Sequence, residues 1–156
     1  MFKMQGVDVE KTIPFILGRG NFLEVGVFLG DRTVKLAKHF DKVYAVDNFC
    51  CDGIDCDKDS IKTETLKRLS NIDNVELIVE NSVKASERFE DGFFDCALID
   101  GGHRYVEVKN DIKAWMPKIK NSGQMVFHDV DRIPVKMAII SYFGKDGIKY
   151  LTPYGS

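Results

Sequence analysis

The sequence has 156 residues, of which 44% are hydrophobic and 29% are charged, and its 22 basic residues nearly balance its 24 acidic ones. This length and composition predict one globular domain without a segment apolar enough to cross a bilayer. A net charge of −2, spread along the chain, gives no electrostatic surface for nucleic acid or membrane, so we expect a small-molecule partner and a cytoplasmic location.

The chain begins with two patterned segments. Residues 7–17 have apolar residues at near-helical spacing and predict a short leading helix interrupted by a proline. Residues 22–25 form an apolar run typical of a strand buried on both faces of a parallel sheet. Gly26 and Gly30 then permit a sharp turn in which the backbone can approach a ligand, and a helix begins at residues 33–38. We interpret this stretch as a ligand-binding turn between a strand and a helix.

The charges in this turn indicate the kind of ligand. A dinucleotide site has the spacing Gly-x-Gly-x-x-Gly and seats a diphosphate at the helix N-terminus, but here Asp31 occupies that place. Glu24, at the end of the strand, is expected to point a negative charge into the pocket. Such a charge suits a ligand with an ammonium or sulfonium group, as S-adenosylmethionine has. An ordinary tight turn in another nucleotide-binding domain is the alternative.

Residues 42–47 form the second expected strand, and Asp47 ends it 21 residues beyond Gly26. An acidic residue about 20 positions after the glycine turn is placed to accept hydrogen bonds from ribose hydroxyls, although a strand-end Asp is also a common cap. The loop that follows contains three closely spaced cysteines, and no fourth cysteine or histidine lies nearby to complete a thiolate metal cluster; they are Cys50, Cys51 and Cys56. The role of this loop stays open.

The rest of the chain continues to alternate between the two patterns. Further strands are expected at residues 74–80, 93–100, 124–129 and 148–152. Helices are expected between them, at residues 59–69, 82–90 and 108–119 and after Pro134, with Leu66 and Tyr142 among the buried residues. This alternation predicts an α/β fold, a doubly wound Rossmann-like parallel sheet of order 3-2-1-4-5 with helices on both faces, and a sixth strand, if formed, at an edge.

Polar side chains follow the carboxyl ends of four of these strands. Ligands in doubly wound sheets bind outside those ends, where the strand order reverses. We therefore expect these side chains to converge on one crevice; they are Glu24, Asp47, Asp100, His128 and Asp129.

Two motifs resemble a known family. The motif Glu24-Val25-Gly26-x-x-x-Gly30-x-x-Thr33 resembles the first motif of class I S-adenosylmethionine-dependent methyltransferases. The segment Ile99-Asp100-Gly101-Gly102-His103-Arg104-Tyr105, with Phe127-His128-Asp129 after the next strand, resembles small-molecule O-methyltransferases related to the catechol type. The resemblance implies one methyltransferase domain over residues 1–156, minimal or shortened at its C-terminus, that methylates an oxygen of a small molecule.

The resemblance also implies which residues contact S-adenosylmethionine. They are Glu24, Gly26, Phe28, Gly30, Thr33, Asp47, Asn48, Asn81, Ser82 and Asp100. Asn81 and Ser82 are explained equally well as caps of the helix that follows them.

Chemistry is expected at the second motif. Asp100, His128 and Asp129 match the metal-ligand positions of the catechol type, where His128 replaces an Asp and Asp129 an Asn. Such a set suits magnesium or manganese. His103 stands where that type has a catalytic lysine, so His103 and Asp100 are the expected catalytic residues, with a capping role for His103 as the alternative. A non-catalytic binding module on the same fold and a homo-oligomer also remain open.

Overall fold

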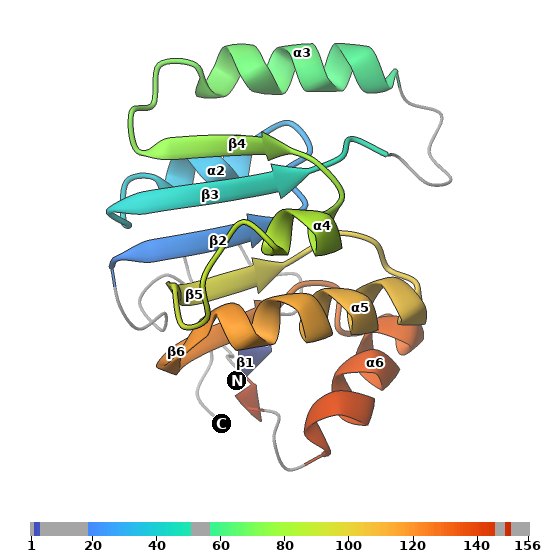
Figure 1. Ribbon diagram of the computed structural model, residues 1–156. Coiled ribbons are helices and arrows are strands. Elements are labelled where there is room, and N and C mark those ends of the chain that lie inside the picture. Colours follow the sequence, from blue (N-terminus) through green and yellow to red (C-terminus); the bar gives the residue numbers. More distant parts are fainter. Residues whose placement is uncertain (1, 4–18, 51–56, 146–148, 151–156) are drawn as a thin grey trace.

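A parallel sheet forms the centre of the molecule. The computed structural model describes residues 2–3, 19–50, 57–145 and 149–150, so the expected helix at residues 7–17 and two of the three clustered cysteines, Cys51 and Cys56, lie outside it. Seven strands follow the order β4-β3-β2-β5-β6-β1-β7, and every neighbouring pair is parallel (Figure 1).

The five longer strands have the predicted order. In sequence they are β2 (Asn21–Val25), β3 (Lys42–Asp47), β4 (Val75–Val79), β5 (Phe94–Ile99) and β6 (Ile119–Phe127). The predicted order 3-2-1-4-5 is therefore confirmed. The expected last strand is β7 (Lys149–Tyr150), at the sheet edge. Strand β1 (Phe2–Lys3) lies between β7 and β6. It was not predicted, because two residues are too few to show a pattern.

Helices cover both faces of the sheet. They are α2 (Asp31–Leu36), α3 (Lys58–Leu69), α4 (Ser82–Ser86), α5 (Tyr105–Trp115) with the 3-10 turn η2 (Met116–Lys118), and α6 (Ile133–Phe143). In Figure 1, α4 and α5 lie in front of the sheet and α2 lies behind it. The larger hydrophobic cluster joins the sheet to α4, α5 and α6, and two smaller clusters join its other face to α2 and α3.

Strand β2 shows why the two faces differ. Its side chains alternate, so Leu23 and Val25 pack in the larger cluster while Phe22 packs with Leu36 of α2. Glu24 has the parity of Phe22 and is therefore directed to the side on which α2 lies. This alternation places an acidic side chain beneath the first turn of a helix.

Three details differ from the sequence-based expectation. Leu66 and Tyr142 are exposed, not buried, because Thr65 and Leu69 form the buried side of α3, and Val135, Ala138 and Ile139 that of α6. The helix that begins at Ser82 ends at Ser86. Strand β6 begins at Ile119, five residues before the expected start at Gln124. Its pairing with β5 is irregular over these extra residues and becomes regular where Gln124 faces Cys96.

Candidate active site

The turn between β2 and α2 is held by backbone constraints. Gly26 has φ +90° and its N–H donates to the carbonyl of Val46 at 2.9 Å. A Cβ at this position would lie 2.8 Å from the nitrogen of Gly101 and closer still to the carbonyl of Asp100, so only glycine fits. Phe28 also has a positive φ, of 53°, and its ring is exposed. The ends of β2 and β5 therefore lie too close together to leave room for a side chain at position 26.

Asp47 shapes the same turn. Its Oδ2 accepts hydrogen bonds from the backbone N–H groups of Val27 at 2.7 Å and Phe28 at 2.9 Å, and its Oδ1 accepts from Phe49 N at 2.6 Å. A carboxylate can accept about four hydrogen bonds, so these contacts leave capacity for one hydroxyl. The contact of Asp47 with a ribose stays a prediction.

Glu24 is placed differently from the expectation. Its side chain is fully buried; Oε1 accepts from Arg32 Nε at 2.6 Å and Oε2 accepts from Thr33 Oγ1 at 2.6 Å. The expectation that Glu24 points a free negative charge into the pocket is therefore wrong, because strand alternation turns it toward α2. Burial has the largest effect on Glu24 and raises its pKa, although the neighbouring Arg32 acts to lower it.

Arg32 connects the two motifs. Besides Glu24, it contacts Asp100 through Nη1 and the carbonyl of Gly26 through Nη2, the latter at 2.9 Å. Sequence reasoning missed this residue, and the only available signal was its place beside Thr33 in the glycine turn. Asp100 in turn has Oδ1 3.1 Å from His128 Nδ1. Burial acts to raise the pKa of Asp100, but His128 and Arg32 together outweigh it and lower the pKa.

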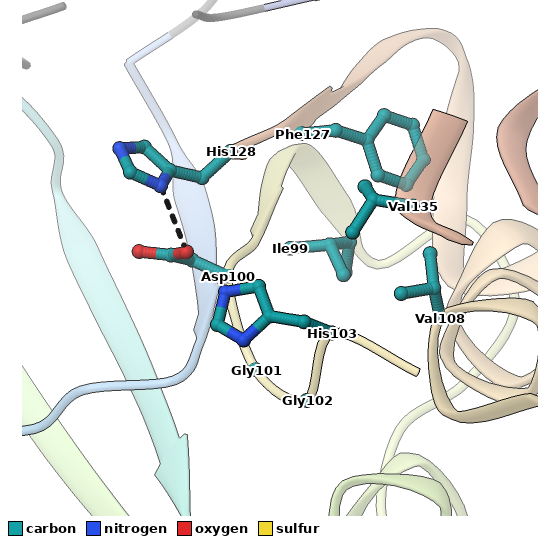
Figure 2. A pocket seen from close by; sticks show the side chains of 9 residues that line it. All are labelled: Ile99, Asp100, Gly101, Gly102, His103, Val108, Phe127, His128 and Val135. Carbon is teal, nitrogen blue, oxygen red and sulfur yellow. Dashed lines mark ion pairs between the residues drawn. The ribbon is translucent and has the colours of Figure 1, made fainter. Parts of the chain in front are cut away.

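His103 and Asp129 complete a polar cluster at the ends of β5 and β6. Asp129, which has φ 50°, lies with Oδ2 2.7 Å from His103 Nε2 and with Oδ1 3.3 Å from His128 Nδ1. The carboxylate of Asp100 raises the pKa of His128. Asp100, His103 and His128 line one side of a small pocket, and apolar side chains line the other (Figure 2); the latter are Ile99, Val108, Phe127 and Val135.

Two ring nitrogens in this cluster meet carboxylates as ion pairs. His103 Nε2 and His128 Nδ1 are buried, and they face Asp129 Oδ2 and Asp100 Oδ1, respectively, without the geometry of a hydrogen bond. Donor atoms of Asp100, His103 and Asp129 all lie within 4.8 Å of one another. The structure therefore groups His103, not His128, with the two carboxylates as the set that could hold a metal ion.

The other expected cofactor residues have local partners. Asn81 caps α4, its Oδ1 accepting from Lys84 N at 3.3 Å, and Asn48 Oδ1 accepts from Cys50 N at 3.0 Å. Ser82 Oγ accepts from Trp115 Nε1 at 2.8 Å, between α4 and α5. These contacts support the capping interpretation of Asn81, and they give Ser82 a packing role; contact of either residue with a cofactor stays a prediction.

A buried acid lies behind the site and was not predicted. Asp111, on α5, bonds to Ser82 and lies close to Gly101, and its burial raises its pKa to about 6. Between about pH 4 and pH 6 the folded chain keeps a proton on Asp111 that the unfolded chain loses. The contribution of Asp111 to the free energy of unfolding therefore falls as the pH rises through that range.

We expect Asp111→Asn to raise the free energy of unfolding at pH 7 by about 1–2 kcal/mol, since a full two-unit shift corresponds to about 3 kcal/mol and the amide recovers only part of it. Urea unfolding at pH 5 and pH 7 measures this. The gain over the wild type should shrink at pH 5, and an equal gain at both values would contradict the assignment.

Comparisons with known proteins agree with this geometry. A family model described as a methyltransferase domain matches residues 23–130, more than half of the chain. The chain belongs to this methyltransferase family. The match covers the turn after β2 and the polar cluster after β5 and β6. S-adenosylmethionine is the cofactor expected for this family. A comparison of the sequence with curated proteins found no match.

Solved structures share the fold. An rRNA methylase from Streptococcus thermophilus has a TM-score of 0.60 at 19% identity, over 85% of this chain and 74% of its own. A Streptococcus mutans protein assigned as a methyltransferase, solved with SAH, has a TM-score of 0.63 at 18% identity, over 91% and 84%. A phosphoethanolamine N-methyltransferase from Haemonchus contortus, with phosphoethanolamine and S-adenosylhomocysteine, has a TM-score of 0.56 at 13% identity, over 75% of this chain.

The lengths of these proteins differ. This methyltransferase domain spans only 24% of the Haemonchus contortus chain. Within the part of the chain that the structure describes, no helix combines the length and apolar character needed to cross a bilayer.

Proposed function

We propose that this methyltransferase transfers the methyl group of S-adenosylmethionine to an oxygen of a small molecule in the cytoplasm, with His103 as the base. One observation carries the proposal: His103 Nε2 lies 2.7 Å from Asp129 Oδ2, beside Asp100. A carboxylate that orients one imidazole nitrogen leaves the other to accept a proton from a substrate. The near-neutral charge of the chain favours a small molecule over nucleic acid or a membrane surface as the acceptor.

Proton removal is the step for which such a base is needed. Methyl transfer is an in-line displacement in which the protein mainly orients the reactants. A phenol with a pKa near 10 is ionised to about one part in a thousand at pH 7, which costs roughly 4 kcal/mol. A base within hydrogen-bond distance of the hydroxyl offsets part of this cost. His103 is about 39% exposed and lies at the edge of the crevice, so an acceptor can reach it.

A divalent cation is the second candidate for this task. The donors fit, because two carboxylates and one imidazole have facing atoms within 4.8 Å of one another, and His103 Nε2 is buried beside Asp129 Oδ2. Asp100, His103 and Asp129 would hold the ion, beside His128, and magnesium or manganese would supply positive charge to the acceptor oxygen. In that case His103 is a ligand and not the base.

The test is methyl transfer from labelled S-adenosylmethionine to a panel of phenols, catechols, sugars and carboxylates. We expect His103→Ala to lower the rate about a hundredfold without weakening S-adenosylhomocysteine binding. His39→Ala, which changes an exposed histidine of another face, is the matched control. Full activity in His103→Ala would contradict the proposed base.

The same assay separates the remaining alternatives. If a cation is used, exhaustive chelation abolishes activity, manganese or magnesium restores it, and Asp129→Ala prevents the rescue while the exposed Asp131→Ala does not. If activity survives chelation, His103 acts as the base. Tight binding of S-adenosylhomocysteine without labelling of any acceptor in the panel would instead support a non-catalytic binding module.

A further inference from the structure

The side chain of Arg132 lies beside His103, the proposed base. Its Nε is 3.3 Å from Asp129 Oδ2, and His103 Nε2 lies 2.7 Å from the same oxygen. A single carboxylate oxygen therefore separates the guanidinium from the imidazole. Because 56% of the Arg132 side chain is exposed, an acceptor that reaches His103 can also reach this guanidinium.

The backbone after β6 holds Arg132 in this position. The N–H of Arg132 donates to the carbonyl of Asp129 at 3.0 Å, which closes a four-residue turn. Val130, inside the turn, is buried in the larger hydrophobic cluster. Asp129 has φ 50°, an uncommon conformation for a residue other than glycine, and such conformations are concentrated at functional sites. The turn and the ion pair together direct the guanidinium toward the polar cluster.

The guanidinium of Arg132 has donors left for a ligand. It carries five N–H groups, and the contact with Asp129 uses the one on Nε. No ion pair or hydrogen bond joins its Nη1 or Nη2 to any residue that the structure describes. These two nitrogens form the planar fork that matches the two oxygens of a carboxylate. Arg132 can therefore bind one anionic group of a ligand in a bidentate manner.

The charges near Arg132 favour a carboxylate over a phosphate as this group. The Asp129 carboxylate faces His103, His128 and Arg132, so its negative charge is largely matched. Asp131, in the same turn, is exposed, and water and salt screen its charge. A phosphate monoester at pH 7 has nearly twice the charge of a carboxylate and would meet a correspondingly larger repulsion from both. The class of ligand that fits is a small hydroxy acid.

We propose that Arg132 binds a carboxylate of the methyl acceptor, so that the enzyme methylates hydroxy acids in preference to neutral compounds with the same hydroxyl group. The inference rests on the proposed function, because it places the accepting hydroxyl at His103. Since His103 and Arg132 contact one oxygen of Asp129, an acceptor with the size of a single aromatic ring spans both. Arg132 then determines specificity and takes no part in proton removal.

The experiment measures methyl transfer from labelled S-adenosylmethionine to matched pairs of acceptors, each a neutral compound and its carboxylate. The pairs are phenol and 4-hydroxybenzoate, catechol and 3,4-dihydroxybenzoate, and glycerol and glycerate. The wild type should have a KM about tenfold lower for the carboxylate of at least one pair, as expected for one charge-assisted hydrogen-bonded contact. Arg132→Met should remove this difference by raising KM for the acid, while the rate with the neutral compound stays within about twofold. Arg132→Lys should retain part of the preference, because it keeps the charge but loses the planar fork.

The matched control is Arg88→Met. Arg88 is 54% exposed and also pairs with one carboxylate, that of Glu80, at 2.8 Å. This variant should leave the preference for the acid unchanged. Calorimetric titration with S-adenosylhomocysteine should give the same affinity for the wild type and for all three variants, which shows that the fold is intact.

Three results would contradict the role of Arg132. A wild type that methylates neutral acceptors as well as or better than carboxylates would overturn the inference and leave the proposed function standing, whether or not the variants fold. An equal loss with both members of a pair in Arg132→Met would also overturn it, because Arg132 would then only support Asp129. Labelling of no acceptor by the wild type, in these pairs and in the wider panel, would overturn both proposals.

Discussion

Replacing Glu24 by alanine is expected to lower the free energy of unfolding by about 3 kcal/mol. Glu24 is fully buried, and both of its carboxylate oxygens accept hydrogen bonds, from Arg32 and Thr33. Its removal leaves the Arg32 guanidinium without one of its two carboxylate partners and the Thr33 hydroxyl without its acceptor. The loss falls at the lower end of the range for breaking a buried ion pair, because Asp100 still contacts Arg32.

Urea unfolding measures this loss, and a second Glu–Arg pair gives the matched control. Glu64 contacts Arg68 at 3.3 Å on the exposed surface of α3, so Glu64→Ala should cost less than about 0.5 kcal/mol. Glu24→Gln, which keeps the volume and one acceptor oxygen, should cost less than Glu24→Ala. A loss below about 1 kcal/mol in Glu24→Ala would show that the buried pair does not support the turn.

The strand order and the convergence of the site could be predicted from the sequence. Apolar runs between glycines mark β2 and β5, and right-handed crossovers leave few ways to arrange alternating strands and helices. Once the order is set, residues after the strands must meet at one edge of the sheet. Asp100 and His128 lie 3.1 Å apart for this reason, although 28 positions separate them in the sequence.

The pairing within the site could not be predicted in the same way. Arg32 lies next to Thr33 in a helical turn, and nothing in its neighbourhood shows that its side chain turns back to reach Asp100. That contact exists because β2 and β5 are neighbours in the sheet, and local sequence patterns do not show which strands are neighbours. The burial of Glu24 had a readable signal, since it shares the parity of Phe22 on β2, but its charge was interpreted as part of the ligand pocket.

Helix faces were predicted less well than strands. Leu66 and Tyr142 were assigned to buried faces because apolar residues usually are buried, but the side chains that face the sheet from these helices include Thr65 and Ala138. A helix against a sheet edge buries only a narrow stripe, and a small or polar residue can occupy it when its hydroxyl is bonded. The Thr65 hydroxyl donates to the carbonyl of Ile61, one turn earlier, at 2.8 Å.

Replacing Gly26 by alanine is expected to have the largest effect, a loss of about 4 kcal/mol in the free energy of unfolding. Two costs add. An alanine at φ +90° is strained, and its Cβ would overlap the backbone carbonyl of Asp100, so the ends of β2 and β5 would have to separate. Because Asp100 carries contacts to Arg32 and His128, any variant that folds should also lose cofactor binding.

Gly92→Ala separates these two costs. Gly92 has φ +70°, comparable to Gly26, but a Cβ there would meet nothing within 4 Å, so its variant has only the strain, about 1 kcal/mol. Urea unfolding of both variants, with titration of S-adenosylhomocysteine into whichever folds, measures the difference. Backbone strain is common to the two variants, so the difference between their losses measures the close approach of Gly26 to Asp100. A loss at least about 2 kcal/mol greater in Gly26→Ala would establish that this approach matters. Losses equal within about 1 kcal/mol would show that the site does not require it.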